Sequence, residues 1–360
     1  MKIIHRYILK ETLWPFLFGF LFFNFILFVG IIFDLTRLIF VESVPLLKVL
    51  ELILFSLPSF FDIVVPVSLL FSILLSFGRL SADGEITALR SSGISLLQIE
   101  SPVLFFAILL TFISLLFSAL LTPWCNQRYK STYQEVLLHR PALQLKEKTI
   151  ISINDKKIYT FELDEKTGMM RQIMLYEFLP FSNQKFPQIS IARKGKIIKE
   201  RILLEGVKLY RSGANYKLFQ YGEFDQQTIY LHAENYAEKK LKKESWDMTF
   251  TEIKNKLREK GLSPEERKKL EIDLQGRIAI PFATFILGIL AIPLGIKVER
   301  GDKSISLGIS LIVVIVYYIF FLAGNFLAKA ELLSPFLGAW IPNFILLALG
   351  VWLNIEMIKR

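Results

Sequence analysis

Six long apolar runs constrain the fold of this chain more than any other feature. They extend from Leu13 to Phe33, Val49 to Phe77, Val103 to Leu121, Ile278 to Ile296, Ile305 to Leu327 and Leu332 to Ile355. About 20 residues of α-helix cross the hydrocarbon core of a bilayer, so each run is long enough to span it. The composition agrees, with 53% hydrophobic residues and a mean hydropathy of +0.45. The sequence therefore predicts an integral membrane protein.

The segment before the first run has the pattern of an interfacial helix. Ile4, Tyr7 and Ile8 fall on one helical face, while Arg6 and Lys10 point elsewhere. A plain positive flank of the first span explains the same residues equally well. No small-residue cleavage site follows the apolar run, which favours a retained span over a signal peptide.

The second run is overlong and carries two prolines, Pro58 and Pro66, with Asp62 between them. Proline removes a backbone donor, so we expect a bent or interrupted helix. A carboxylate at that depth is costly and usually faces a protein interior, a cavity or a partner. Asp62 is therefore a candidate functional residue.

Between Asn126 and Gln275 the character changes to short amphipathic segments. Strands are predicted around residues 157–163, 173–178, 207–210 and 216–221, with turns at residues 164–168, Gly195, Gly206 and Ser212–Gly213. This spacing suggests a β-sandwich or an open jelly roll. Two helices are expected to close the domain, one ended by Gly261 and one opened by the capping sequence Ser263-Pro-Glu-Glu266. Asp273 can then pair with Arg277 at i,i+4.

Basic residues near the spans predict the orientation of the chain in the membrane. One side holds ten of them and the short loops opposite hold three. The ten are Lys2, Arg6, Lys10, Arg79, Arg90, Lys297, Arg300, Lys303, Lys359 and Arg360; the three are Arg37, Lys48 and Lys329. The positive-inside rule places the larger group, and with it both termini, in the cytoplasm.

The fold class that follows is an α-helical membrane protein with six transmembrane helices (3+3) and an inserted external β-jelly-roll-like domain. The predicted parts are residues 1–123 with the first three spans, 124–276 with the β domain and its closing helices, and 277–360 with the last three spans. From Trp124 to Gly276 there are 29 Lys and Arg against 21 Asp and Glu. A basic surface of this kind suits anionic lipid headgroups, although a merely solvated basic surface is at least as good an explanation.

A short polar insert, Gly78 to Glu100, joins the second and third spans on the cytoplasmic side. Ser81 can cap a helix at about residues 82–92, with Asp83 and Glu85 where the helix dipole favours acid. Gly93 is suited to end that helix, because a residue just past a helix often needs positive φ. The sequence Ser95-x-x-Gln98 predicts a capping box for the next helix. A compact helix at the membrane face is the structure we expect.

The residue types present give little support for chemistry within this chain. The sequence has no phosphate-binding loop of the type G-x-x-x-x-G-K-[ST] and no G-x-S-x-G elbow. Its three histidines are far apart and show no metal-ligand spacing, so no metal site is predicted. The lone Cys125 cannot form an internal disulfide and fits a small apolar filler. If the protein moves a substrate uphill, another chain must supply the nucleotide chemistry.

Several motifs in register resemble the LptF/LptG (YjgP/YjgQ) family of lipopolysaccharide export permeases, and RYILKET at the start leans toward the LptF side. They are RYILKETLWPF, the two prolines Pro58 and Pro66, GRLSADGEITALRSSGIS, DLQGRIAIPFA, IPLGI and AWIPNFILLALGVWL. Together with the 3 + β domain + 3 order, they extend the resemblance over essentially the whole chain.

The resemblance implies a subunit of an ATP-driven exporter in the bacterial inner membrane, with no catalytic site and no cofactor of its own. ATP and Mg²⁺ would bind to a cytoplasmic LptB-like ATPase dimer. The other implied partners are a second, LptG-like permease, LptC-like and LptA-like bridge proteins in the periplasm, and lipopolysaccharide. Nucleic acid is not among them.

Residue roles also follow from the resemblance. The insert corresponds to the coupling helix that docks on the ATPase, which assigns coupling to Asp83, Glu85, Arg90 and Gly93, with Glu85 at the family's glutamate. Basic residues near the outer end of the first span contact lipid A phosphates in the family, and Arg37, with Asp34 nearby, is the match. The first and fifth spans, at residues 16–33 and 305–327, would line the substrate cavity. Asp62 stands where relatives often carry an uncharged polar residue, so its role stays open.

Two alternatives come from the residues themselves. An ion-coupled secondary transporter of a lipid or amphiphile is suggested by Asp62 between two prolines, but the last three spans contain no corresponding proline-flanked carboxylate. A membrane enzyme acting on lipid would need paired carboxylates or a nucleophile with its base, and the sequence shows neither. Co-purification of an ATPase would discriminate among the three.

Overall fold

The structure, a computed structural model, describes residues 2–40, 44–139, 148–153, 156–164, 168–177, 188–198, 201–212, 219–230, 243–259, 261–297 and 303–359. Within them, 6 helices are long and apolar enough to cross a membrane. A β-sheet lies between the third and fourth of these helices in the sequence. The predicted fold class, a helical membrane protein with an inserted β domain, is confirmed.

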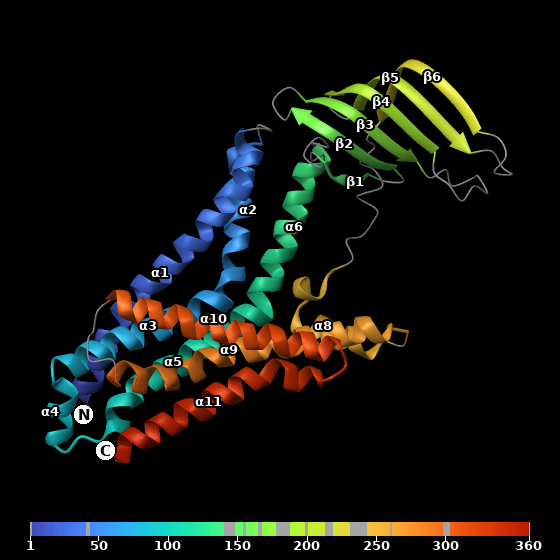
Figure 1. Cartoon of the computed structure of the whole chain (residues 1–360). Coiled ribbons are helices and arrows are strands. Elements are labelled where there is room, and N and C mark those ends of the chain that lie inside the picture. The colour runs from blue at the N-terminus through green and yellow to red at the C-terminus, as the bar shows by residue number, and fades with distance from the viewer. Residues whose placement is uncertain are drawn as a thin grey trace. The chain divides into compact units, whose positions relative to one another are not determined.

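The chain divides into two compact units. The helical unit comprises Met1–Ile31, Leu54–Arg128 and Lys243–Arg360. The β-containing unit comprises Ile32–Ile53 and Tyr129–Lys242. Figure 1 shows the elements of both. The helices are α1 (Lys2–Phe40), α2 (Leu46–Ser56), α3 (Phe61–Ala82), α4 (Glu85–Ser91), α5 (Leu96–Leu116), α6 (Thr122–His139), α8 (Phe250–Arg258), α9 (Pro264–Lys297), α10 (Lys303–Lys329) and α11 (Pro335–Lys359).

The first helix is longer than the first apolar run. The segment predicted to lie in the membrane interface forms the opening turns of α1, and the helix continues through Pro15 to Phe40. The interfacial segment and the first span are therefore one continuous rod.

Proline interrupts the second span as expected. Pro58 lies in a 3₁₀ turn, Leu57–Phe60, that separates α2 from α3. Pro66 lies in the second turn of α3, and that helix continues without a break. A 3₁₀ turn keeps the backbone hydrogen-bonded where proline has no N–H to give.

The third span does not end at Pro123, where the sequence analysis placed its end. α5 passes through a π-helical turn, Phe117–Leu121, into α6, which continues to His139. Pro123 is the second residue of α6, and it has no N–H to donate within this continuous helix. The wider π turn directly before it absorbs the change in the hydrogen-bond pattern.

The fourth span and the helix before it are also continuous, as α9. The backbone N–H of Glu266 donates to Ser263 Oγ at 3.1 Å, which confirms the predicted cap. The predicted stop of α8 at Gly261 is wrong: the helix ends at Arg258, its C-cap Glu259 is extended, and Gly261 lies in the following turn with φ 116°. A second capping box, which the sequence analysis missed, opens α8: Thr249 N–H donates to Glu252 Oε2 at 2.7 Å and Glu252 N–H to Thr249 Oγ1 at 3.3 Å.

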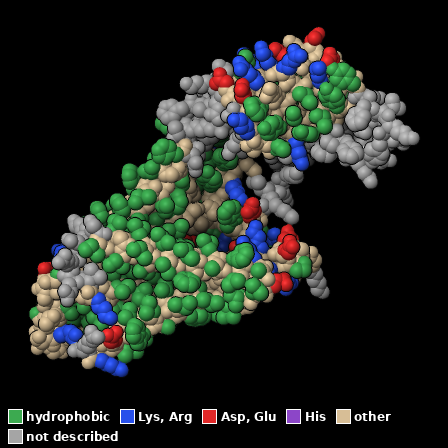
Figure 2. All heavy atoms as spheres, in the orientation of Figure 1, with side chains coloured by type: hydrophobic (Ala, Val, Ile, Leu, Met, Phe, Trp, Pro, Cys, Tyr) green, Lys and Arg blue, Asp and Glu red, His purple; other side chains and the backbone are tan. Residues whose placement is uncertain are grey.

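α3 and α9 form the centre of the helical unit. In the apolar windows of their spans, 72% and 67% of the residues are buried, compared with 17% for α1 and 28% for α10. The outward face of α1 exposes Trp14, Phe18, Leu21, Phe25 and Phe33, and that of α10 exposes Ile312, Ile315, Ile319, Leu322 and Phe326. Figure 2 shows hydrophobic side chains over most of the visible face of the helices. Such a surface suits lipid or another membrane helix rather than water.

The β-containing unit holds one antiparallel sheet of six strands in sequential order, with no second sheet among the described residues. The strands are β1 (Ile150–Ile153), β2 (Lys156–Asp164), β3 (Met169–Glu177), β4 (Gln188–Ile198), β5 (Arg201–Ser212) and β6 (Phe219–Tyr230). Each strand pairs with the next along the chain, so the strand order that the sequence left open is a meander. Ile158, Ile173, Leu175, Leu204 and Val207 belong to its buried apolar cluster.

Two of the predicted turns are wrong. Gly195 lies inside β4, opposite Leu204, and Gly206 lies inside β5. A Cβ at Gly195 would lie 2.5 Å from Ile173 Cδ1, so close packing on the sheet explains that glycine. At the predicted turn of residues 164–168, the Gly168 N–H donates to the carbonyl oxygen of Asp164 at 2.8 Å and Gly168 has φ 66°, while residues 165–167 lie outside the described residues. The predicted turn residue Gly213 lies outside the described residues.

The contact between α10 and α11 generates a test of the fold. A Cβ at Gly324 would lie 2.1 Å from the carbonyl oxygen of Gly338, so the two backbones touch here. We expect Gly324→Ala to lower the unfolding free energy by about 1–3 kcal/mol, the usual cost of overpacking. Thermal unfolding of the purified protein in detergent measures this change.

Gly308→Ala is the matched control, because Gly308 lies in the same helix and a Cβ added there would meet nothing within 4 Å. Alanine there gains helix propensity of about 1 kcal/mol. An equal loss of stability in both variants would contradict the close contact.

Candidate functional site

The cytoplasmic insert is a tight helix–turn–helix–turn–helix connection. α3 ends at Ala82, α4 occupies Glu85–Ser91, and α5 begins at Leu96. Gly84 before α4 and Gly93 after it have φ angles of 73° and 86°. Nothing lies within 4 Å of a Cβ built on either glycine, so the sign of φ alone explains glycine at both positions. The predicted stop at Gly93 is confirmed.

Capping in this connection is partly as predicted. The backbone N–H of Ser95 donates to Gln98 Oε1 at 3.1 Å, the expected signature before α5. Ser81 does not cap α4, because it lies within α3 and donates its hydroxyl to the carbonyl oxygen of Ile296 at 3.0 Å. The N-cap of α4 is Gly84. Ser81 therefore ties the end of α3 to α9 instead.

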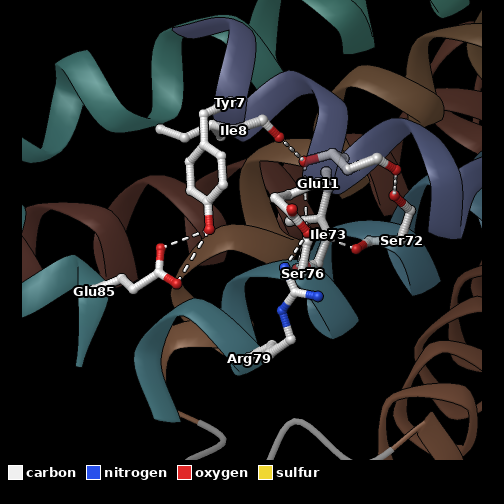
Figure 3. A network of polar contacts seen from close by, with 9 residues as sticks. Tyr7, Ile8, Glu11, Ser72, Ile73, Ser76, Arg79 and Glu85 are labelled. Carbon is white, nitrogen blue, oxygen red and sulfur yellow. Dashed lines mark hydrogen bonds and ion pairs between the residues drawn. The ribbon is translucent and has the colours of Figure 1, made fainter. Parts of the chain in front are cut away.

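Glu85, the first residue of α4, has both carboxylate oxygens within hydrogen-bond distance of one side chain of α1. The hydroxyl of Tyr7 in α1 lies 2.8 Å from Glu85 Oε2 and 3.1 Å from Oε1. Figure 3 shows the phenol ring of Tyr7 reaching across to the carboxylate. Both side chains keep contact with solvent, Tyr7 with 38% of its surface exposed and Glu85 half-buried. The carboxylate is thus held in place and still within reach of a partner.

A second polar link lies one turn farther along α1 and joins it to α3. Arg79 Nη2 in α3 forms an ion pair with Glu11 Oε2 in α1. Farther into the helical unit, Thr12 Oγ1 lies 3.4 Å from Ser76 Oγ, and the Ser72 hydroxyl donates to the carbonyl oxygen of Thr12 (Figure 3). Thr12, Ser72 and Ser76 are fully or almost fully buried. Small hydroxyl side chains let the two helices approach closely.

The other predicted coupling residues lie nearby but make no polar link to Glu85. Asp83 and Arg90 are exposed, and their side chains form no hydrogen bond or ion pair with described residues. Gly93 is exposed at the turn after α4. An acid before the helix, an acid at its start and a base in its last turn suit the helix dipole. They also leave charges free for a partner surface.

Asp62 lies at the other end of α3, in its first turn. Its backbone carbonyl oxygen accepts a hydrogen bond of 3.2 Å from Tyr318. Oδ1 is buried without a hydrogen-bond partner among the described residues. The carboxylate of Asp62 therefore faces the interior of the helical unit.

Arg277 belongs to a polar cluster that the sequence analysis only partly anticipated. Arg277 Nη2 donates to the carbonyl oxygen of Ser245 at 2.8 Å, and the hydroxyl of Ser245 bonds to Asp273. Asp273 and Arg277 thus meet through Ser245 rather than in the predicted direct ion pair. Gln127 Nε2 adds a 2.6 Å bond to the carbonyl oxygen of Asp247. These contacts fasten the turn before α8 to α6 and α9.

The predicted substrate residues belong to the far end of α1. Asp34 and Arg37 lie within the helical span of α1, but their side chains lie outside the described residues. Tyr7 and Glu11 are the functional candidates that sequence reasoning missed. The signal that could have found them was their i,i+4 spacing in RYILKE, which places both on one helical face.

The part of the chain that the structure describes shows no group of three or more His, Cys, Asp or Glu side chains that could hold a metal ion. Cys125 is a buried free thiol in α6, as its predicted filler role requires.

Gly93 offers a test of the insert geometry. At φ 86°, Gly93→Ala should cost about 1–2 kcal/mol of local stability, because a Cβ in the left-handed region meets the following carbonyl. Gly93→Asn should cost less, since asparagine tolerates this conformation. Hydrogen–deuterium exchange over residues 85–91 measures the effect. Equal protection in both variants and the wild type would contradict it.

Comparisons with known proteins bear on this arrangement. The model of the family described as "Lipopolysaccharide export system permease LptF/LptG" matches residues 6–356. Proteins named "Lipopolysaccharide export system permease protein LptF" from Escherichia coli K12 and Shigella flexneri are 20% identical over 322 residues. The alignment covers 87% of this chain and 84% of each relative. Because the family model covers nearly the whole chain, this protein belongs to the LptF/LptG family of lipopolysaccharide export system permeases.

Proposed function

We propose that this chain is a permease subunit of an ATP-driven exporter that extracts lipopolysaccharide from the outer leaflet of the inner membrane and passes it to a periplasmic bridge. The observation that carries the proposal is α4. It is a short helix fixed between two membrane helices, with a positioned carboxylate at its start, in a chain of the permease family. A helix in this position can transmit force from a soluble protein to both of its flanking spans.

The orientation follows from the basic residues flanking the spans. Both chain termini and α4 lie on the basic side, which we assign to the cytoplasm. The β-containing unit is then periplasmic, where its sheet would continue into the bridge. On this assignment, residues 1–123 and 277–360 are the membrane parts and residues 124–276 the β domain.

The partners are proposed from two features of the chain. Its sequence contains no phosphate-binding loop, and its surface exposes α4 and the apolar sides of α1 and α10. A cytoplasmic ATPase dimer would bind ATP and Mg²⁺ and receive α4 in a groove. Its basic groups would form charge-assisted hydrogen bonds with Glu85, and Asp83 and Arg90 would add contacts at the rim. A second permease of the same family would face the exposed apolar sides of α1 and α10. Lipopolysaccharide would enter between those helices, residues 16–33 and 305–327.

Glu85→Gln tests the coupling role. The amide keeps the size of the side chain but removes the charge, so export should fall about tenfold or more, the value of losing a hydrogen bond to a charged group. Lipopolysaccharide release from vesicles that contain the assembled ATPase complex is the measurement. Glu265→Gln, an exposed acid at the start of α9, is the control.

Wild-type release of lipopolysaccharide by the Glu85→Gln variant would contradict the proposed coupling role of Glu85. Release that needs no ATPase and follows an ion gradient instead would overturn the proposed function. It would favour the ion-coupled transporter suggested by the interior position of Asp62.

Arg37→Ala tests the substrate site. A guanidinium near the outer end of α1 would pair with lipid A phosphates, so its loss should reduce crosslinking of lipopolysaccharide to the permease several-fold. Docking of the ATPase should stay normal. Lys329→Ala, a basic residue on the same side of the membrane, serves as the control. An unchanged crosslinking yield for Arg37→Ala would contradict the assignment, and Asp34 would then be tested in the same way.

A further inference from the structure

Two polar links connect the opening turns of α1 to the α3–α4 segment. They join residues far apart in the sequence: Tyr7 to Glu85, 78 positions away, and Glu11 to Arg79, 68 positions away. Tyr7 and Glu11 are one helical turn apart, so they form a single stripe on α1 that faces the insert (Figure 3).

The geometry at Glu85 leaves room for a second ligand. A phenol has one hydrogen to donate, whereas an ionised carboxylate has about four acceptor sites. The Tyr7 hydroxyl therefore fixes the direction of the carboxylate and leaves most of its acceptor sites unoccupied. A cationic side chain of a docking protein can take the remaining sites, because both residues are partly exposed.

Buried residues of α1 support the face that carries Tyr7 and Glu11. Ile8 and Thr12, on the neighbouring face, have no exposed surface. The Thr12 hydroxyl donates to the Ile8 carbonyl oxygen at 2.9 Å and lies 3.4 Å from Ser76 Oγ. The first turns of α1 and the last turns of α3 are thus packed as one block. α4 joins that block through a turn at Gly84, and its residue Ile86 is buried in the same apolar cluster as Ile8.

Besides the apolar packing of Ile86, a pull on α4 can reach the membrane helices by two routes. One is the backbone through Gly84 into α3, and the other is the side-chain contact from Glu85 to Tyr7 in α1. α1 is a continuous helix of 39 residues, roughly 58 Å at 1.5 Å per residue. The second route thus ends in a rod that crosses the whole apolar layer.

We propose that Tyr7 is a positioning residue for energy coupling, which aims the Glu85 carboxylate at a cationic group of the ATPase and links α4 directly to α1. The Glu11–Arg79 ion pair holds α1 in the register that this contact needs. The proposal rests on the proposed function and extends it from α4 to the N-terminal turns of α1.

Tyr7→Phe is the decisive variant, because it removes one oxygen atom and keeps the ring. In vesicles with the complete ATPase complex, we expect lipopolysaccharide released per ATP hydrolysed to fall about three- to tenfold. The amount of assembled complex and the rate of ATP hydrolysis without substrate should stay at the wild-type level. Tyr176→Phe, which removes an exposed phenol oxygen in β3, is the matched control.

Charge reversal tests the ion pair in the same assay. Glu11→Arg and Arg79→Glu should each lower the release per ATP, and the double variant should recover at least half of the wild-type ratio. Recovery shows that the two residues act on each other. If the losses of release per ATP in the two single variants add in the double variant, the Glu11–Arg79 ion pair has no part in coupling.

Three outcomes would overturn the proposal, and they are distinguishable. A wild-type ratio in Tyr7→Phe together with a loss in Glu85→Gln overturns the role of Tyr7 and leaves the proposed function intact. A parallel loss of complex assembly and ATP hydrolysis in Tyr7→Phe shows a merely structural contact. Absence of ATP-dependent release by the wild-type complex overturns the proposed function and this proposal together.

Discussion

Backbone N–H and C=O groups inside a bilayer find no water, and this constraint governs how the chain treats its prolines. At Pro58 the backbone tightens into a 3₁₀ turn, and before Pro123 it widens into a π turn. Polar side chains then connect the two regions. The Thr122 hydroxyl donates to the carbonyl oxygen of Pro58 at 3.3 Å, and the Ser59 hydroxyl donates to the side-chain oxygen of Asn126 at 2.8 Å. The two irregular turns thus support each other across neighbouring spans.

Polar contacts also join α3 to its neighbours. At one end, Tyr318 donates to the backbone carbonyl oxygen of Asp62. Farther along, serine and threonine hydroxyls bind backbone oxygens and one another between α1 and α3. Both arrangements add directional contacts to the apolar packing around α3.

The functional site combines the packed pair of α1 and α3 with the short helix α4. α4 lies between two glycines of positive φ, and its residue Ile86 is buried in the apolar core of the helical unit. Glu85 belongs to α4 but is held by Tyr7 of α1. A docking protein that engages Glu85 would therefore act on both parts at once. This property distinguishes the insert from an ordinary ordered loop.

The sequence by itself determined the elements whose cause is local or periodic. Apolar runs predicted all six spans, strand-like alternation predicted the inserted β domain, and Gly93 and the Ser95–Gln98 pair predicted the end of α4 and the start of α5. The tertiary structure decided what depends on partners distant in the chain. Ser81 is no cap because the Ile296 carbonyl takes its hydroxyl, and Gly195 is no turn because Ile173 packs against it. Tyr7 and Glu11 looked like parts of a membrane flank, since nothing within their own helix shows that residues 78 and 68 positions later complete their hydrogen bonds. Helical and strand periodicity are properties of a segment, whereas a hydrogen bond between segments exists only once the helices have packed.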